Sequence, residues 1–471
     1  MADGSSINKP APAPPSKVTD VKKLDGVSYD HSDEAKGGRS NSMPEFRISY
    51  PFLLSCVGTA ALGSLLLGYD LGIISGAIVP IKNEFNLSGL EVEMLTSSIT
   101  LASILGSFIA GIVADKFGRK KGLLSAAAIF FAGVSSVVSV PAEPTHINEF
   151  PNNGIGVGMG LVICPMYCAE LSPRRLRGMV TSSNEMFINV GIPLAFLVNL
   201  MLAGLPNDWR WMLVSENKNI NTSSFSEFER SIPALGLFTT TCFLPESPRW
   251  LLKSSRADEA KETVELLVHK DESPSVRQQV VAQTLADMRQ DFAGEQITWS
   301  QLFSDDKRKF AIGMTFSFFQ QIIGTDGILF YAVYTLQEFG VSSRDALVIT
   351  LIMGIIKLLT TVLSSVIVDY PKVGRRKPLM VGGFICFLGN LSVAIAAIFS
   401  NGAGGLIFGA LTFIGGFGLS YGPLCWLILA EMFSGPYRSK ALSFGRNLMI
   451  PSRVLHDDRH LHTSTEAEFV V

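Results

Sequence analysis

Long apolar stretches follow one another along most of this chain. Eight of them reach the length of about 20 residues that a helix needs to cross a bilayer. They occupy residues 50–80, 91–114, 122–140, 179–203, 309–337, 345–368, 378–399 and 404–433. Two more, 154–169 and the pair 209–214 with 231–244, are short or interrupted. A soluble core can bury one such helix, but eight together predict an all-α polytopic membrane protein with about ten crossings.

Charged residues are few and grouped. They make up 17% of the chain, against roughly 25% in soluble domains. Because the formal net charge is −2 and the Lys and Arg residues gather in short connections, we expect no nucleic-acid partner. All six cysteines fall inside apolar stretches. We therefore expect them to be small core residues, with no metal site and no disulfide framework.

The basic connections also predict the topology. If the residues before Phe52 are cytosolic, every basic connection falls on the cytosolic side, as the positive-inside rule requires. These connections are 115–121, 173–177, 245–308, 369–377 and 437–440. The parity works only if both interrupted stretches cross. We expect a multi-pass protein of the lipid bilayer, in the plasma membrane or the vacuolar membrane, with its N-terminus in the cytosol.

One basic turn occurs twice. Residues 111–122 read GIVADKFGRKKG between two apolar stretches, and residues 369–377 form a second version between two others. A repeated turn of this kind predicts two pseudo-symmetric helical halves. The expected parts are a disordered cytosolic tail (1–48), an N-terminal transmembrane half (49–244), a cytosolic helical linker (245–308), a C-terminal transmembrane half (309–444) and a polar tail (445–471).

Seven motifs in the same order resemble the sugar porter family of the major facilitator superfamily, and the proton-linked polyol, inositol and hexose carriers within it most of all. They are GYDLGIISGA (68–77), GIVADKFGRK (111–120), PMYCAELSPRRLRG (165–178), PESPRW (245–250), QQIIGTDGILFYA (320–332), VDYPKVGRR (368–376) and YGPLCWLILAEMF (421–433). The resemblance covers about residues 50–445. It implies the major facilitator fold and a secondary transporter that moves a monosaccharide or polyol by alternating access, with proton symport. It implies no enzyme, no cofactor and a monomer.

Asp70 is the expected proton carrier. A carboxylate inside a span costs about 2.5–3.5 kcal/mol on insertion scales and so marks a pathway or a proton relay. In proton-coupled relatives the acid at this place carries the proton. The alternative is an aspartate that only hydrogen-bonds to a neighbouring helix. Lys357 is a cation within another span, and it must face a polar interior or a partner.

Amide, acidic and aromatic side chains form the expected substrate site, because they suit the hydroxyls and the apolar faces of a sugar. From the resemblance these are Gln320, Gln321, Asp326, Glu185, Tyr421 and Trp426, with Asn184 and Tyr331 nearby. Packing alone explains Trp426 equally well. The run GIGVGMG at 154–160 is typical of close helix packing, because no strand precedes it as a nucleotide fingerprint would require.

Charged residues at the cytosolic ends resemble the ion-pair network with which the family latches its two halves. They are Asp115, Arg119, Glu170 and Arg177 in the first half, Asp369, Arg375, Glu431 and Arg438 in the second, and Glu246 and Arg249 in the linker. Breaking such pairs on one side permits the halves to rock. The same residues can instead serve only to orient the turns.

The sequence departs from the family pattern at three places. Phe150 occupies the position where the family carries an arginine that would pair with Asp70, the polar insert 215–230 interrupts the sixth span, and the last two of twelve spans are not found. An alternative is therefore a truncated or mis-spliced chain that is inactive, regulatory or a sugar sensor. On that basis we expect little uptake from the chain of 471 residues.

Overall fold

The computed structural model describes residues 49–139, 151–172, 177–203, 235–293, 307–368, 370, 373–399 and 403–432. The predicted tails, the insert 215–230, Phe150, Asp369 and Arg438 lie outside these residues. The described helices are α1 (Tyr50–Phe85), α2 (Gly89–Phe117), α3 (Arg119–Ser139), α4 (Pro151–Leu171), α5 (Arg177–Leu202), α8 (Pro248–Lys253), α9 (Ala257–Leu267), α10 (Pro274–Ala293), α12 (Lys307–Ile322), α13 (Thr325–Glu338), α14 (Ser343–Val368), α15 (Arg376–Phe399), α16 (Ala403–Leu419) and α17 (Tyr421–Met432). Residues 235–243, within the interrupted stretch 231–244, are also helical.

Seven stretches of these helices are long and apolar enough to cross a membrane. They are Tyr50–Phe85, Gly89–Phe117, Gly154–Leu171, Ser183–Leu202, Ser343–Val368, Arg376–Phe399 and Ala403–Leu429. The short stretch at 154–169, which the predicted topology required to cross, lies within the 21-residue helix α4. The prediction of an all-α polytopic membrane protein is confirmed, although the length and hydropathy test counts seven spans in the described residues where the sequence predicted about ten.

The predicted seventh and tenth spans are not continuous helices. Residues 309–337 divide into α12 and α13, and the N-cap Gly324 between them has a φ of 89°, which glycine adopts without strain. Residues 404–433 divide into α16 and α17 at Ser420. Discontinuous membrane helices expose backbone groups at membrane depth, where transporters of several folds place their binding sites.

Helices that precede the linker pack against one another through glycines. A Cβ atom added at Gly154 would lie 2.3 Å from the Ile99 carbonyl oxygen, and one added at Gly158 would lie 2.0 Å from that of Ser103. Both contacts bring the backbones of α4 and α2 together, and only glycine permits such an approach. The prediction that GIGVGMG is a packing motif is confirmed.

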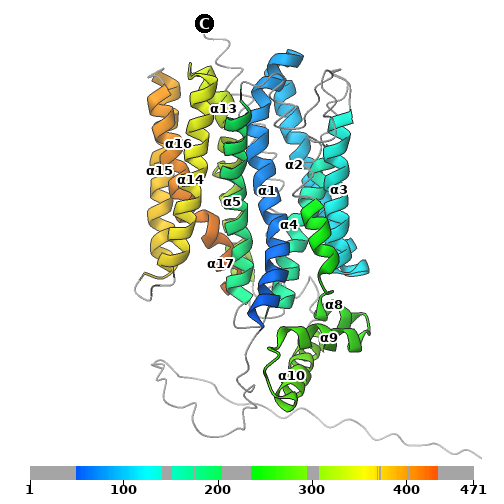
Figure 1. The fold of residues 1–471 in the computed structure, drawn as a ribbon. Helices are drawn as coiled ribbons and strands as arrows, with labels where there is room; N and C mark the ends of the chain where they lie inside the picture. The colour runs from blue at the N-terminus through cyan, green and yellow to red at the C-terminus, as the bar shows by residue number, and fades with distance from the viewer. Residues whose placement is uncertain are drawn as a thin grey trace, which may run out of the picture. The chain divides into compact units, whose positions relative to one another are not determined.

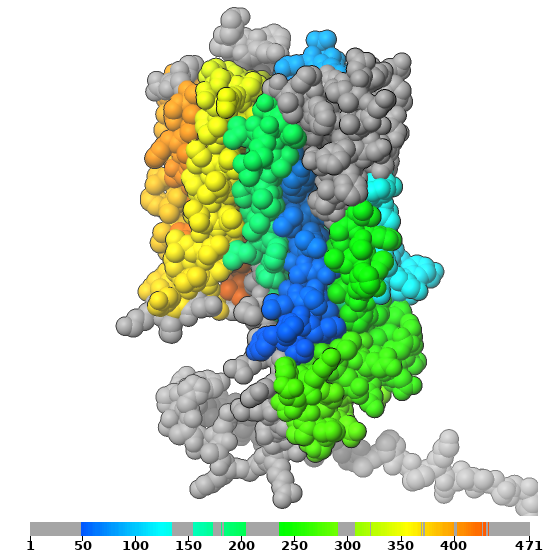
Figure 2. Space-filling view, viewed as in Figure 1, coloured from blue at the N-terminus to red at the C-terminus, as the bar shows by residue number. Residues whose placement is uncertain are grey.

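Helix α5 lies between α1 and α14 in both overall views (Figures 1 and 2) and packs against both. Helix α1 also packs against α13, and α5 against α17. These contacts join the helices that precede the linker to those that follow it. Phe196 of α5 is fully buried in one apolar cluster with Met353 of α14 and Phe413 of α16.

Helices α8, α9 and α10 lie at one end of the membrane helices (Figure 1), which we call the linker end. Their small core includes Leu251 and Ala260. The backbone N–H of Ser49 donates to the Leu267 carbonyl at 2.9 Å, which ties the start of α1 to α9. Cys242 corrects one expectation, because it is exposed whereas the other five cysteines are buried.

Candidate functional site

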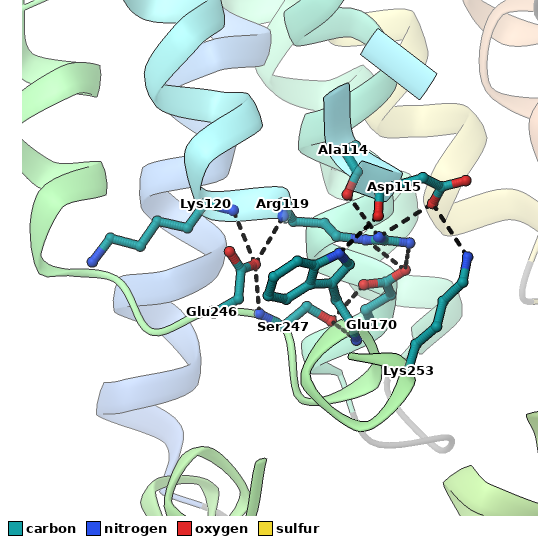
Figure 3. A network of polar contacts seen from close by, with 9 residues as sticks. Ala114, Asp115, Arg119, Lys120, Glu170, Glu246, Ser247 and Lys253 are labelled. Atoms are coloured by element: carbon teal, nitrogen blue, oxygen red, sulfur yellow. Dashed lines mark hydrogen bonds and ion pairs between the residues drawn. The ribbon is translucent and has the colours of Figure 1, made fainter. Parts of the chain in front are cut away.

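The basic turn between α2 and α3 surrounds one buried guanidinium (Figure 3). Arg119 is 8% exposed. Its Nη2 lies 2.8 Å from Glu170 Oε1 and its Nη1 lies 3.3 Å from Asp115 Oδ1, while Nη1 also donates to the Ala114 carbonyl at 2.9 Å. A buried arginine needs such paired and hydrogen-bonded neighbours. Three of the predicted ion-pair residues therefore meet at one point.

Glu246 binds the start of α3 through its carboxylate. Its Oε1 accepts hydrogen bonds from the backbone N–H groups of Arg119 at 2.8 Å, Lys120 at 3.0 Å and Ser247 at 2.9 Å (Figure 3). The first N–H groups of a helix have no partner within the helix, and the positive end of its dipole favours an anion. Glu246 thus caps α3 from a distant part of the chain.

Gly118 makes this cap possible. Its φ of +103° lies in a region that L side chains rarely adopt, and a Cβ atom there would lie 2.2 Å from Glu246 Oε2. Both its backbone conformation and its missing side chain are therefore required. The carboxylate of Glu246, in the PESPRW motif, therefore lies against Gly118 of the predicted turn.

Four contacts in this site were not anticipated. Ser247 Oγ donates to Glu170 Oε2, and Trp250 Nε1 donates to the Asp115 carbonyl at 3.0 Å. Tyr167 donates to the Pro245 carbonyl at 2.8 Å, and Lys253 Nζ lies 3.9 Å from Asp115 Oδ1. Ser247, Trp250 and Tyr167 stand inside quoted motifs, so the motifs themselves were the available signal. Arg249, which was predicted to join the network, lies in α8 and is half-buried.

The second turn repeats one contact of the first. Arg375 Nη1 donates to the Val368 carbonyl at 2.5 Å, as Arg119 donates to the Ala114 carbonyl. Gly374 precedes it at a φ of +64°. The side chains of Arg177 and Glu431 lie outside the described set, so their part in the network remains a prediction.

Replacing Glu246 with alanine is expected to destabilise the turn between α2 and α3. Three backbone N–H groups would lose their carboxylate acceptor, which should cost about 2 kcal/mol or more. Thermal unfolding of the purified protein in detergent measures the effect. Glu262→Ala is the matched control because Glu262 is exposed on α9. Equal unfolding temperatures in both variants would contradict this role.

Gln320 joins the two broken helices. It lies two residues before α12 ends, and its Nε2 donates to the carbonyl of Tyr421, the first residue of α17, at 3.4 Å. The side chain is 5% exposed. Its Oε1 is buried and finds no hydrogen-bond partner among the described residues. An unpaired buried amide oxygen is costly, which points to a partner that arrives from outside the chain.

Tyr421 follows the break at Ser420, and Asp326 follows the break at Gly324. Tyr421 is half-buried, and its ring centroid lies 5.9 Å from that of Phe316. Asp326 is half-buried in the first turn of α13. The side chains of Gln321 and Trp426 are not among those described. The structure therefore brings Gln320 and Tyr421 together, and a common site with Asp326, Gln321 and Trp426 remains a prediction.

Asp70 is buried within α1, with 3% of its surface exposed. Gly68 and Gly72 on either side of it contact α5, so Asp70 lies on the opposite face of α1. Glu185 of α5 is half-buried and accepts from Asn189 Nδ2 at 3.4 Å. Asn184 is buried and accepts from Ser64 Oγ at 3.1 Å.

Lys357 faces the protein interior, as its charge requires. Only 5% of the residue is exposed, and its Nζ lies 5.9 Å from the ring centroid of Phe417. A cation over an aromatic face is stabilised by the ring quadrupole. The prediction that this ammonium would not face lipid agrees with its burial.

Two tyrosines of α13 bind α1 and α2, at the end of the membrane helices opposite the linker end. Lys82 Nζ of α1 donates to Tyr334 OH at 2.8 Å and lies 4.4 Å from the centroid of that ring. Thr96 Oγ1 of α2 and Tyr331 OH lie 2.5 Å apart. Tyr331 was expected near the substrate. The Lys82 contact was not predicted, because none of the seven motifs includes Lys82.

Membrane helices before and after a helical linker, with two broken helices in the part that follows the linker, are the arrangement of a membrane transporter of the major facilitator fold. The chain belongs to a transporter family, since the family model "Sugar (and other) transporter" matches residues 56–455. It is therefore an integral membrane transporter and not an enzyme.

Relatives agree with this assignment. The chain is 34% identical over 391 residues to the D-xylose transporter of Levilactobacillus brevis, a match that covers 82% of this chain and 80% of that protein. It is 30% identical over 434 residues to the D-xylose-proton symporter of Escherichia coli strain K12, covering 85% and 83%. The structure of the proton:xylose symporter XylE bound to 6-bromo-6-deoxy-D-glucose superposes with a TM-score of 0.71 at 27% identity, covering 89% of this chain and 90% of that one.

Proposed function

We propose that this protein carries a monosaccharide or a polyol across a membrane by alternating access, in symport with protons. The observation that carries the proposal is Gln320, whose buried Oε1 has no partner among the described residues at the point where two broken helices meet. A sugar hydroxyl is a donor of the right size and strength for that oxygen. The names of the xylose transporters above support the same substrate class.

Each predicted residue has a role in this proposal. Gln320, Gln321, Asp326 and Glu185 would hydrogen-bond the hydroxyls, and Tyr421 and Trp426 would cover the apolar face of the ring. Asp70 would carry the proton. Its burial inside α1 supports this role, because a carboxylate there is favoured only when it is protonated or paired.

The charged network would stabilise one state of the transport cycle. It joins α2, α3 and α4 to the linker through Arg119, Glu170 and Glu246, and linker helices bind the start of α1 through Leu267. We place the linker end in the cytosol, because the basic turns lie there. We expect the membrane to be the plasma membrane or the vacuolar membrane.

Counterflow in lipid vesicles tests this function and identifies the substrate. Purified protein is reconstituted into vesicles loaded with unlabelled xylose, glucose, inositol or sorbitol, and entry of the same labelled compound is followed. At least one of these compounds should accumulate transiently and saturably, at the low rate that the three departures from the family pattern predict. Counterflow of none of them would contradict the substrate class.

A further inference from the structure

Three glycines of α1 bring its backbone against α5. Gly68, Gly72 and Gly76 follow at intervals of one helical turn, so they share one face. A Cβ atom at Gly68 would lie 2.0 Å from the Ile188 carbonyl oxygen, and one at Gly72 would lie 2.7 Å from Ala195 Cβ. This face has no room for a side chain, so the two backbones lie in direct contact, and their register is fixed where a side chain bonds across them.

Asn199 of α5 supplies that fixed point. Its Nδ2 donates to the Gly72 carbonyl at 3.0 Å, and the side chain is 0% exposed. A Cβ atom at Gly76 would lie 2.4 Å from this amide. The Asn199 Oδ1 is buried and has no partner among the described residues. Because an unpaired buried amide oxygen destabilises the fold, packing alone does not account for an asparagine here.

The same part of α1 has a weakened hydrogen-bond ladder. Pro80 lies inside the helix and has no N–H to donate to the carbonyl of Gly76. Glycine in a helix interior adds backbone freedom. Helices kink at proline and at such weakened turns. The segment from Gly72 to Pro80 is therefore the easiest place for α1 to bend.

The weak segment separates two functional parts of α1. Asp70 stands just before it, and Lys82 just after it binds Tyr334 of α13 at 2.8 Å. The carbonyl of Gly72 is bonded to Asn199 of α5, whereas Lys82 beyond Pro80 is bonded to a helix that follows the linker. A bend between them would let the end of α1 follow α13 while Asp70 keeps its place.

We infer that residues 72–80 form a hinge in α1 and that Asn199 is the positioning residue that pins the inner side of this hinge to α5. The inference rests on the proposed function only for its role in transport. The hinge itself is a property of the helix, and it can be measured without a substrate.

Hydrogen–deuterium exchange of the purified protein tests the hinge. Asn199→Ala should make the peptide that covers 72–84 exchange about tenfold faster, because a bond to the hinge is lost. Ser75→Ala is the matched control: Ser75 is fully buried on the same segment and its Oγ has no partner among the described residues. In the Ser75→Ala variant the same peptide should exchange at the wild-type rate. Unchanged exchange in Asn199→Ala, or an equal rise along all of α1, would overturn the inference.

Pro80→Ala gives the opposite change and does not depend on the Asn199 variant folding. Restoring the N–H at position 80 should slow exchange in the same peptide and lower the maximal rate of counterflow several-fold, with an unchanged KM. Faster exchange, or a change in KM alone, would count against the hinge. If no vesicle shows counterflow, the exchange result still stands and the failure belongs to the proposed function.

Discussion

Asp70→Asn is expected to abolish accumulation of the sugar against its gradient while counterflow persists. The amide has nearly the size of the carboxyl group but cannot bind and release a proton. The residue is 3% exposed within α1, so a permanent neutral group there should leave the helix packing intact. Uptake into vesicles with an imposed pH gradient measures accumulation, and counterflow without a gradient measures exchange.

Asp345→Asn provides the control for this experiment. Asp345 is an exposed carboxylate near the start of α14, where it accepts from Ser342 Oγ at 2.7 Å. The variant should accumulate sugar like the wild type. If Asp70→Asn also accumulates sugar to the wild-type level, Asp70 is not the proton carrier.

Gln320→Met is expected to weaken sugar binding by about 10- to 100-fold, since one or two hydrogen bonds from a buried amide are lost. Methionine keeps the length and flexibility of the side chain and removes its polar atoms. The unpaired Oε1 and the long hydrogen bond to the Tyr421 carbonyl disappear together, and because their effects on stability are opposite, the unfolding temperature in detergent should change little. Isothermal titration of the purified protein with the substrate found by counterflow measures the affinity.

Ser317→Ala is the control for Gln320→Met. Ser317 is fully buried one turn earlier in α12, and its Oγ donates to the Gly313 carbonyl of the same helix at 3.0 Å. Its removal should leave affinity unchanged. Wild-type affinity in Gln320→Met would show that this amide does not contact the sugar, whatever the vesicles transport.

The sequence predicted the membrane helices because hydropathy and length are local properties. It did not predict the breaks at Gly324 and Ser420, because the apolar residues on both sides keep each stretch hydrophobic over the length of a span, although Gly324 stands in the polar run GTDG. A break at membrane depth depends on tertiary contacts, such as the hydrogen bond from Gln320 of α12 to the Tyr421 carbonyl of α17. Such contacts are tertiary and leave no trace in hydropathy.

The sequence predicted four residues that meet in the charged network, Asp115, Arg119, Glu170 and Glu246, but not how they bind their neighbours. Motifs identified Arg119, Glu170 and Glu246 as a group. They could not show that Glu246 caps α3 through three backbone N–H groups, because backbone donors carry no sequence signature. The Asn199 contact with Gly72 was missed for the same reason, since its acceptor is a carbonyl.

Sugar-driven proton movement in wild-type vesicles tests the central claim most directly. Vesicles that contain the reconstituted protein and a pH-sensitive dye are mixed with the counterflow substrate, with no pH gradient present at the start. The downhill entry of sugar should acidify the interior, and this signal should be absent in Asp70→Asn vesicles and in vesicles without protein. Sugar entry with no change of internal pH in the wild type would contradict proton symport by this chain.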